Sequence, residues 1–67
     1  MPYVNIKITD EAVTRKQKAA LVKQTTQMLV DILGKNPATT HVVIDEVNTD
    51  NWAVGGELVS DIRKRTT

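Results

Sequence analysis

Apolar and polar residues alternate at the start of the chain and predict a strand. Val4, Ile6 and Ile8 alternate with polar or amphipathic neighbours over residues 3–8, which is the period of a strand with one covered face. Pro2 stands directly before this run. Proline suits the first position of a strand because it has no N–H to contribute to the ladder. The following segment, Thr9–Val13, is predicted to be a loop.

A helical period follows the loop. Thr14 and Gln17 have the spacing of a capping box, and Gly34 is expected to occupy the C′ position just past the last helical residue. Between these signals, Thr25 and the apolar residues recur at the i, i+1, i+4, i+7, i+8 and i+11 spacing of one helical face. That apolar face consists of Leu21, Val22, Met28, Leu29, Ile32 and Leu33.

A second strand is predicted over residues 40–47, which are β-branched and almost continuously apolar, as in a parallel strand covered on both faces. Strand, helix and strand form a right-handed βαβ unit. Residues 48–51 favour a turn, residues 52–56 a short extended piece broken by two glycines, and residues 57–65 a short helix. We therefore expect one α/β (α+β) domain over residues 1–67, a β-α-β protomer with a short C-terminal hairpin or helix.

The size of the chain favours an assembly of several copies. A chain of 67 residues buries only about 60% of the surface of its unfolded form. It has no cysteine and one histidine, so neither disulfides nor a zinc-type cluster can add stability, and we expect no metal. Two strands and one helix also leave sheet edges and one sheet face uncovered. Oligomerisation would cover both.

Charge and hydropathy narrow the class of partner. The net charge is +1 and the aromatic residues are Tyr3 and Trp52, so nucleic-acid binding is not expected. The basic cluster Arg63-Lys64-Arg65 is interpreted as solvated charge at a helix C-terminus. No apolar run approaches the roughly 20 residues of a membrane span, and the start of the chain lacks the hydrophobic core of a signal peptide. A soluble cytoplasmic protein is expected.

Four segments together carry a family resemblance. They are Met1–Ile8, Gln17-Lys18, Ile44–Val47 and Asn51–Leu58, the last with an aromatic residue two positions before Val-Gly-Gly-Glu. In these segments the chain resembles the 4-oxalocrotonate tautomerase family along essentially its whole length. The resemblance implies β-α-β protomers that pair into dimers and assemble as a homohexamer, a trimer of dimers, with a role in the breakdown of aromatic compounds. It also implies catalysis without a cofactor, by Pro2 as the base after removal of Met1.

The chain departs from the family where the substrate is bound. Family members carry an arginine in the loop after the first strand, whereas the loop here is acidic and the nearest arginine is Arg15. A second family arginine aligns with His41, and the aromatic residue that lines the site aligns with Trp52. Arginine is favoured for bidentate carboxylate binding, so the resemblance supplies the base and the apolar wall but not the clamp for a dicarboxylate.

The function expected from the resemblance is an enol–keto proton transfer on a small 2-oxo acid. Once Met1 is removed, Pro2 is a secondary amine, and terminal amines titrate near pH 7.7–8.0, lower when buried or near cations. The same amine could instead attack a carbonyl and form an iminium. If Met1 stays attached, Pro2 has no free amine and is only the first residue of a strand.

The other candidate residues have plainer alternatives. His41 is either a hydrogen-bond donor to the substrate or an ordinary sheet residue, and Trp52 is either the wall of the site or part of an interface. Arg15 is either a displaced carboxylate binder or a solvated first-turn residue. Two other functions stay open: a lyase or hydratase acting on an unsaturated acid, and a non-catalytic oligomer on the same scaffold.

Overall fold

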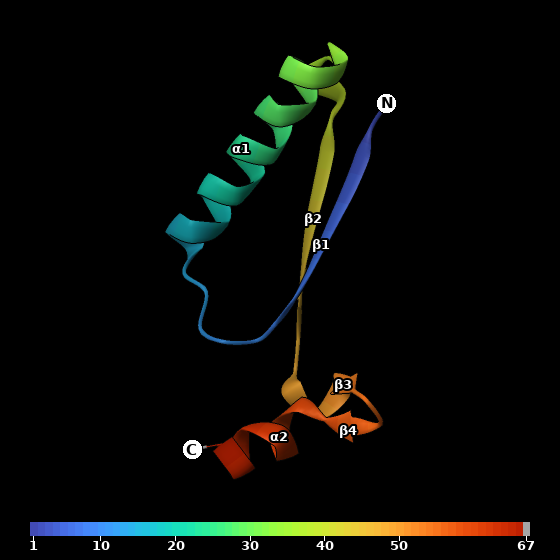
Figure 1. The fold of residues 1–67 in the computed structure, drawn as a ribbon. Helices are drawn as coiled ribbons and strands as arrows, with labels where there is room; N and C mark the ends of the chain where they lie inside the picture. The colour runs from blue at the N-terminus through green and yellow to red at the C-terminus, as the bar shows by residue number, and fades with distance from the viewer. Residues whose placement is uncertain (67) are drawn as a thin grey trace.

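The structure of the protein is a computed structural model that describes residues 1–66. The single domain predicted over residues 1–67 therefore includes one residue, Thr67, that lies outside the described part. Figure 1 shows two long strands with one helix beside them and a small C-terminal segment beyond their far end. The elements in chain order are β1 (Tyr3–Thr9), α1 (Arg15–Leu33), the 3-10 turn η1 (Pro37–Thr39), β2 (His41–Val47), the 3-10 turn η2 (Thr49–Asn51), β3 (Ala53–Val54), β4 (Glu57–Leu58) and α2 (Val59–Thr66).

Helix α1 begins and ends where its capping residues predict. The Thr14 hydroxyl accepts the Gln17 backbone N–H at 3.1 Å, and the Gln17 side-chain oxygen accepts the Thr14 N–H at 2.9 Å, which completes the capping box. At the other end Gly34 adopts a left-handed conformation with φ 65° and donates its N–H to the Val30 carbonyl at 2.9 Å. Both boundaries follow from hydrogen bonds within a few residues of sequence.

Strands β1 and β2 pair in parallel with Tyr3 opposite His41 and Thr9 opposite Val47, as a βαβ unit requires. Thr9 thus belongs to β1 and not to the predicted loop. Side chains alternate between the two faces of the sheet. Helix α1 covers one face, where its Lys18 forms an ion pair with Glu46 of β2. The opposite face, which carries Tyr3 and His41, is open in the single chain.

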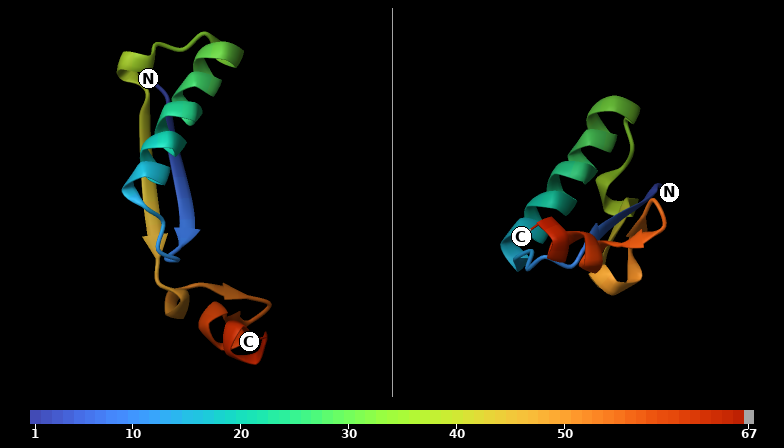
Figure 2. Two further views of the ribbon diagram at one scale, coloured as in Figure 1. Left: turned by 90° about the vertical axis from the view of Figure 1, so that its left-hand side faces the viewer. Right: turned by 60° about the horizontal axis from the view of Figure 1, so that its bottom comes forward.

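The C-terminal segment forms a hairpin followed by a helix. Gly55 and Gly56 have φ of 61° and 84°, and positive φ at both central positions is what a two-residue hairpin turn between β3 and β4 needs. The prediction of a helix from residue 57 is wrong at its start, because Glu57–Leu58 pairs with β3 before α2 begins. Figure 2 shows this segment projecting beyond the end of β2, away from the N-terminus.

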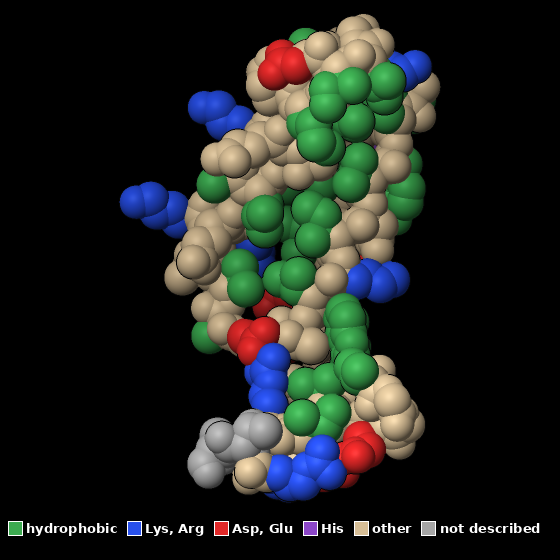
Figure 3. All heavy atoms as spheres, viewed as in Figure 1, with side chains coloured by type: hydrophobic (Ala, Val, Ile, Leu, Met, Phe, Trp, Pro, Cys, Tyr) green, Lys and Arg blue, Asp and Glu red, His purple; other side chains and the backbone are tan. Residues whose placement is uncertain are grey.

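A single chain does not form a closed core. Among the residues whose side chains are described none is fully buried, and the accessible surface is 5136 Å², against about 4,200 Å² for a compact monomer of this mass. The radius of gyration is 15.4 Å, against about 11 Å for a compact domain of this length. Four of the six apolar residues predicted for the face of α1 are exposed, namely Leu21, Met28, Ile32 and Leu33, and so is Val43 on the open face of β2. Large hydrophobic side chains lie exposed along the molecule (Figure 3), among them Tyr3, Met28, Ile32, Leu33 and Val54.

Candidate active site

Pro2 lies at the corner of the sheet, just before β1. Its carbonyl accepts the His41 backbone N–H at 3.0 Å, so the ladder of β1 and β2 holds its backbone in place. Pro2 is half-buried, while Met1 in front of it is 89% exposed. Loss of Met1 would therefore leave a secondary amine on a fixed strand end rather than on a mobile tail.

The backbones of His41 and Pro2 are hydrogen-bonded, but their side chains lie on different faces of the sheet. It pairs with Tyr3 and falls on the open face of the sheet, and its side chain is exposed. By alternation Pro2 falls on the same side as Val4, which is the face covered by α1. The two residues therefore lie at the same end of the sheet but on opposite faces.

Trp52 and Arg15 lie at the other end of the molecule. Trp52 follows η2, after β2 has ended, and its carbonyl accepts the Val59 N–H of α2 at 2.7 Å. Because β2 is seven residues long, about 20 Å separates this end from the strand start beside Pro2 (Figure 1). Arg15 is the first residue of α1 and is exposed. The structure does not bring the four predicted site residues together within one chain.

The open face of the sheet carries a polar cluster. Asp45 accepts the Asn5 side-chain N–H at 2.8 Å and forms an ion pair with Lys7 at 3.0 Å. The hydrogen bond from Asn5, and then the contact with Lys7, lower the pKa of Asp45 below its usual value. On the other face, Lys18 likewise lowers the pKa of Glu46. Asp45 and Glu46 thus point to opposite faces, as predicted for neighbours on a strand.

A second charged contact lies at the far end of the sheet, in the loop after β1. Glu11 forms an ion pair with Arg63 of α2 and accepts the Thr9 hydroxyl at 2.5 Å. The Arg63 hydrogen bond, and then that of Thr9, lower the pKa of Glu11. Arg65 pairs with Glu57 at 2.5 Å. The predicted position of the basic cluster, exposed in the last turn of α2, is confirmed, and two of its members, Arg63 and Arg65, form these ion pairs in addition. For Arg63, the acidic loop was the signal that could have revealed the partner.

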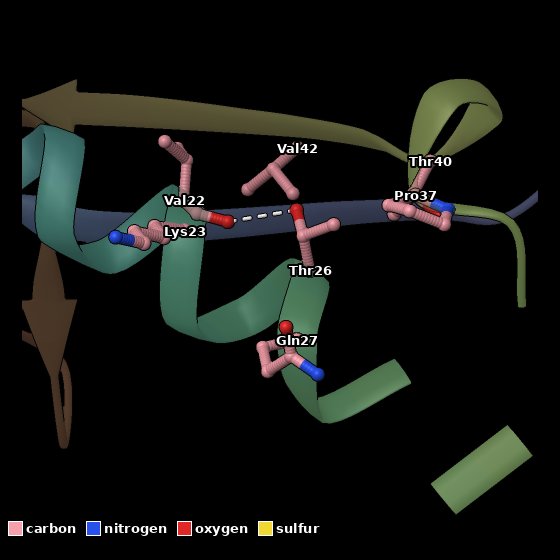
Figure 4. Close-up of a pocket in the computed structure, with 7 residues that line it drawn as sticks. All are labelled: Val22, Lys23, Thr26, Gln27, Pro37, Thr40 and Val42. Carbon is pink, nitrogen blue, oxygen red and sulfur yellow. Dashed lines mark hydrogen bonds between the residues drawn. The ribbon is translucent and has the colours of Figure 1, made fainter. Parts of the chain in front are cut away.

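A groove between α1 and the start of β2 is shown in Figure 4. Its Thr26 hydroxyl donates to the Val22 carbonyl of the same helix at 2.8 Å, so that group is already engaged. None of the four predicted site residues lines this groove. Within the described residues, no group of three or more His, Cys, Asp or Glu is placed to hold a metal ion. The groove is lined by Val22, Lys23, Thr26, Gln27, Pro37, Thr40 and Val42.

No helix in the described part of the chain has the length and apolar character to cross a bilayer. The predicted cytoplasmic location stays a prediction.

Comparison with known proteins identifies the family. Residues 2–62 match the family model described as "Tautomerase enzyme". The chain is 58% identical, over 67 residues and the whole of both chains, to "Probable tautomerase K2" of Dickeya dadantii. It superimposes on the crystal structure of DmpI from Helicobacter pylori with a TM-score of 0.88 at 38% identity, covering 94% of this chain and 97% of that one.

A structure of known assembly is also similar. The heterohexamer 4-oxalocrotonate tautomerase of Chloroflexus aurantiacus matches with a TM-score of 0.83 at 25% identity, over 94% of this chain and all of that one. These similar structures have the same fold as this chain, a β-α-β protomer with a C-terminal hairpin and helix. The chain belongs to the tautomerase family and is an isomerase of the 4-oxalocrotonate tautomerase type.

Proposed function

We propose that the protein catalyses cofactor-independent enol–keto proton transfer on a small 2-oxo acid, with the amino-terminal Pro2 as the general base after removal of Met1. The observation that carries this proposal is the position of Pro2 at a strand end, where its carbonyl is bonded to the His41 N–H at 3.0 Å. A base held by a sheet keeps its geometry towards the substrate, which a mobile terminus cannot do.

The proton transfer needs one group that acts first as base and then as acid. The neutral amine of Pro2 takes the proton of the enol O–H, and the O–H electron pair forms the C=O bond of the ketone. The electrons of the former C=C bond then take the proton back from the Pro2 ammonium at C3 in a 1,3-shift or at C5 in a 1,5-shift. Desolvation by an aromatic wall keeps the amine neutral near pH 7, and Trp52 is the residue proposed for that wall.

The site is proposed to form between copies of the chain. Pro2 and Trp52 lie at opposite ends of the sheet, so a wall for Pro2 has to come from another copy. The open sheet face and the exposed stripe of α1 provide surface for such contacts. A homohexamer, a trimer of dimers, is the proposed assembly, consistent with the heterohexamer found for the Chloroflexus aurantiacus relative.

Substrate binding is proposed for His41 and Arg15 as well as Trp52. Both would come from neighbouring copies, because within one chain they lie on another face or at the other end from Pro2. His41 would donate a ring N–H to the carboxylate or the enolate oxygen, and Arg15 would supply a cation from the start of α1. The two arginines with which family members bind substrate are absent from their usual positions in this chain. One imidazole and one arginine therefore suit a monocarboxylate better than a dicarboxylate. The proposed substrate class is therefore a small 2-oxo monoacid.

The experiment compares two forms of the same chain that differ only in Met1. Intact-mass measurement identifies the processed and the unprocessed protein, and ultraviolet absorbance follows ketonisation of a stable dienol of a 2-oxo acid. The form with a free Pro2 amine should be faster by about 10²- to 10⁴-fold, the usual contribution of a positioned base. Equal rates for the two forms would exclude the amine of Pro2 as the base.

The two prolines of the chain supply a matched control. Pro2→Ala should remove most of the ketonisation activity, whereas Pro37→Ala, at the start of η1, should leave it unchanged. Hydration of an unsaturated acid by a processed protein that does not ketonise a dienol would instead identify a hydratase on the same scaffold.

A further inference from the structure

The segment that carries Trp52 is built as one piece. In this C-terminal unit, residues 49–66, the Val59 N–H donates to the Trp52 carbonyl at 2.7 Å. The Asn51 N–H donates to the Asn48 carbonyl at 2.8 Å, which closes the turn that precedes Trp52. Trp52 therefore moves with the first turn of α2. Whatever holds α2 in place also sets the position of the Trp52 backbone, and with it the point from which the ring extends.

The loop after β1 is held in a defined shape. The Asp10 N–H donates to the Val47 carbonyl at 2.8 Å, which fastens the loop to the end of β2, and the Thr9 hydroxyl binds Glu11. Ala12 has φ 61°, in the left-handed region that a residue with a side chain rarely adopts. Such a conformation persists only when neighbouring contacts enforce it. The loop is thus fastened to β2 directly before Glu11, and Glu11 itself is held by the Thr9 hydroxyl.

The loop and the C-terminal unit face each other across a shared groove. Its loop side is acidic and its α2 side is basic, and Glu11 bridges it by the ion pair with Arg63. Arg63 lies one helical turn after Val59, so both lie on the same side of α2. Contacts therefore run from the loop through Glu11, Arg63 and the first turn of α2 to Trp52. The groove is lined by Asp10, Glu11, Thr49, Ser60, Arg63 and Lys64.

We propose that Glu11 is a positioning residue that acts through Arg63 and α2 to orient Trp52 in the active site. This inference rests on the proposed role of Trp52 as the wall of the site. In this proposal Glu11 affects substrate binding only by positioning Trp52. It does so from the loop in which family members carry a substrate-binding arginine. Glu11 itself does not touch the substrate.

Trp52 is the single tryptophan of the chain, so its fluorescence reports directly on this contact. Glu11→Gln and Arg63→Gln should each shift the Trp52 emission and increase its quenching by acrylamide. They should also raise KM about two- to fivefold with kcat changed by less than about twofold, because an exposed ion pair makes a small contribution. The exchanged pair Glu11→Arg with Arg63→Glu should restore emission and KM towards the wild-type values.

The pair Glu57–Arg65 is the matched control, because it lies within the C-terminal unit and does not reach the loop. Glu57→Gln should leave the Trp52 emission and KM unchanged. Light scattering verifies that each variant stays assembled. For a Glu11 variant that dissociates, Thr9→Val keeps the charge, removes one contact to Glu11, and should change emission in the same direction.

Two outcomes would overturn the proposal. One is an unchanged Trp52 emission and quenching in assembled Glu11→Gln and Thr9→Val protein. The other is an equal response of Glu57→Gln, which would mean a general effect of charge around α2. If the wild-type protein does not ketonise a 2-oxo acid, the proposed function fails, but the fluorescence comparison still decides whether Glu11 positions Trp52.

Discussion

The exposed apolar stripe of α1, formed by Leu21, Met28, Ile32 and Leu33, leads to a quantitative prediction about assembly. Ile32, in the last turn of α1, has a large apolar side chain that is 74% exposed in the single chain. Full burial of an isoleucine stabilises by about 1.5–3 kcal/mol, so covering the exposed part of Ile32 contributes about 1–2 kcal/mol per chain. An interface between two copies contains two such side chains, which amounts to about 2–4 kcal/mol.

Ile32→Ala removes most of this contribution without weakening the helix, since alanine has the higher helix propensity. The concentration at which the assembly dissociates should therefore rise about 30- to 1,000-fold. Sedimentation velocity over a dilution series measures this concentration. Lys16→Ala, at an exposed polar position of the same helix, should leave it unchanged. An Ile32→Ala protein that dissociates at the wild-type concentration would refute the assignment of this stripe to an interface.

Two further predictions concern single residues. Gly34→Ala should reduce the free energy of unfolding by about 1–2 kcal/mol, because nothing lies within 4 Å of an added Cβ and only the left-handed backbone is strained; thermal unfolding at fixed protein concentration measures it, and an unchanged midpoint would contradict the reasoning. The pKa of Asp45 is lowered in the folded chain, so its carboxylate stabilises the fold above the pKa of the unfolded chain and loses this effect as the pH falls below about 4 towards the folded value. Asp45→Asn should flatten the pH dependence of stability in that acid range, and an identical pH profile would exclude this contribution.

Local signals in the sequence were sufficient for most of the secondary-structure elements. Thr14, Gln17 and Gly34 determine where α1 begins and ends, because each acts through hydrogen bonds to residues a few positions away. Alternation predicted β1, and the two glycines after Val54 marked the hairpin. The main error, a helix predicted from residue 57, arose because the two-residue strand β4 is too short to have a period of its own.

The tertiary structure decided where the predicted site residues lie. The sequence pointed to Pro2, His41, Trp52 and Arg15, but the parallel register of β1 and β2 places Pro2 and Trp52 at opposite ends of the sheet. Because side chains alternate between the two faces of the sheet, His41 and Pro2 also lie on opposite faces. Register depends on contacts between segments about 40 residues apart, which no local pattern encodes.

The Glu11–Arg63 ion pair, too, depends on contacts between distant segments of the chain. Each residue alone reads as a solvated charge, and only the fold brings an acidic loop near the start of the chain to a basic helix at its end. The sequence by itself therefore indicated most of the secondary structure and the family, and it pointed to Pro2 as the candidate base. The tertiary structure decided which side chains stay exposed in one chain and how far apart the candidate site residues lie, because burial and proximity depend on how distant segments meet.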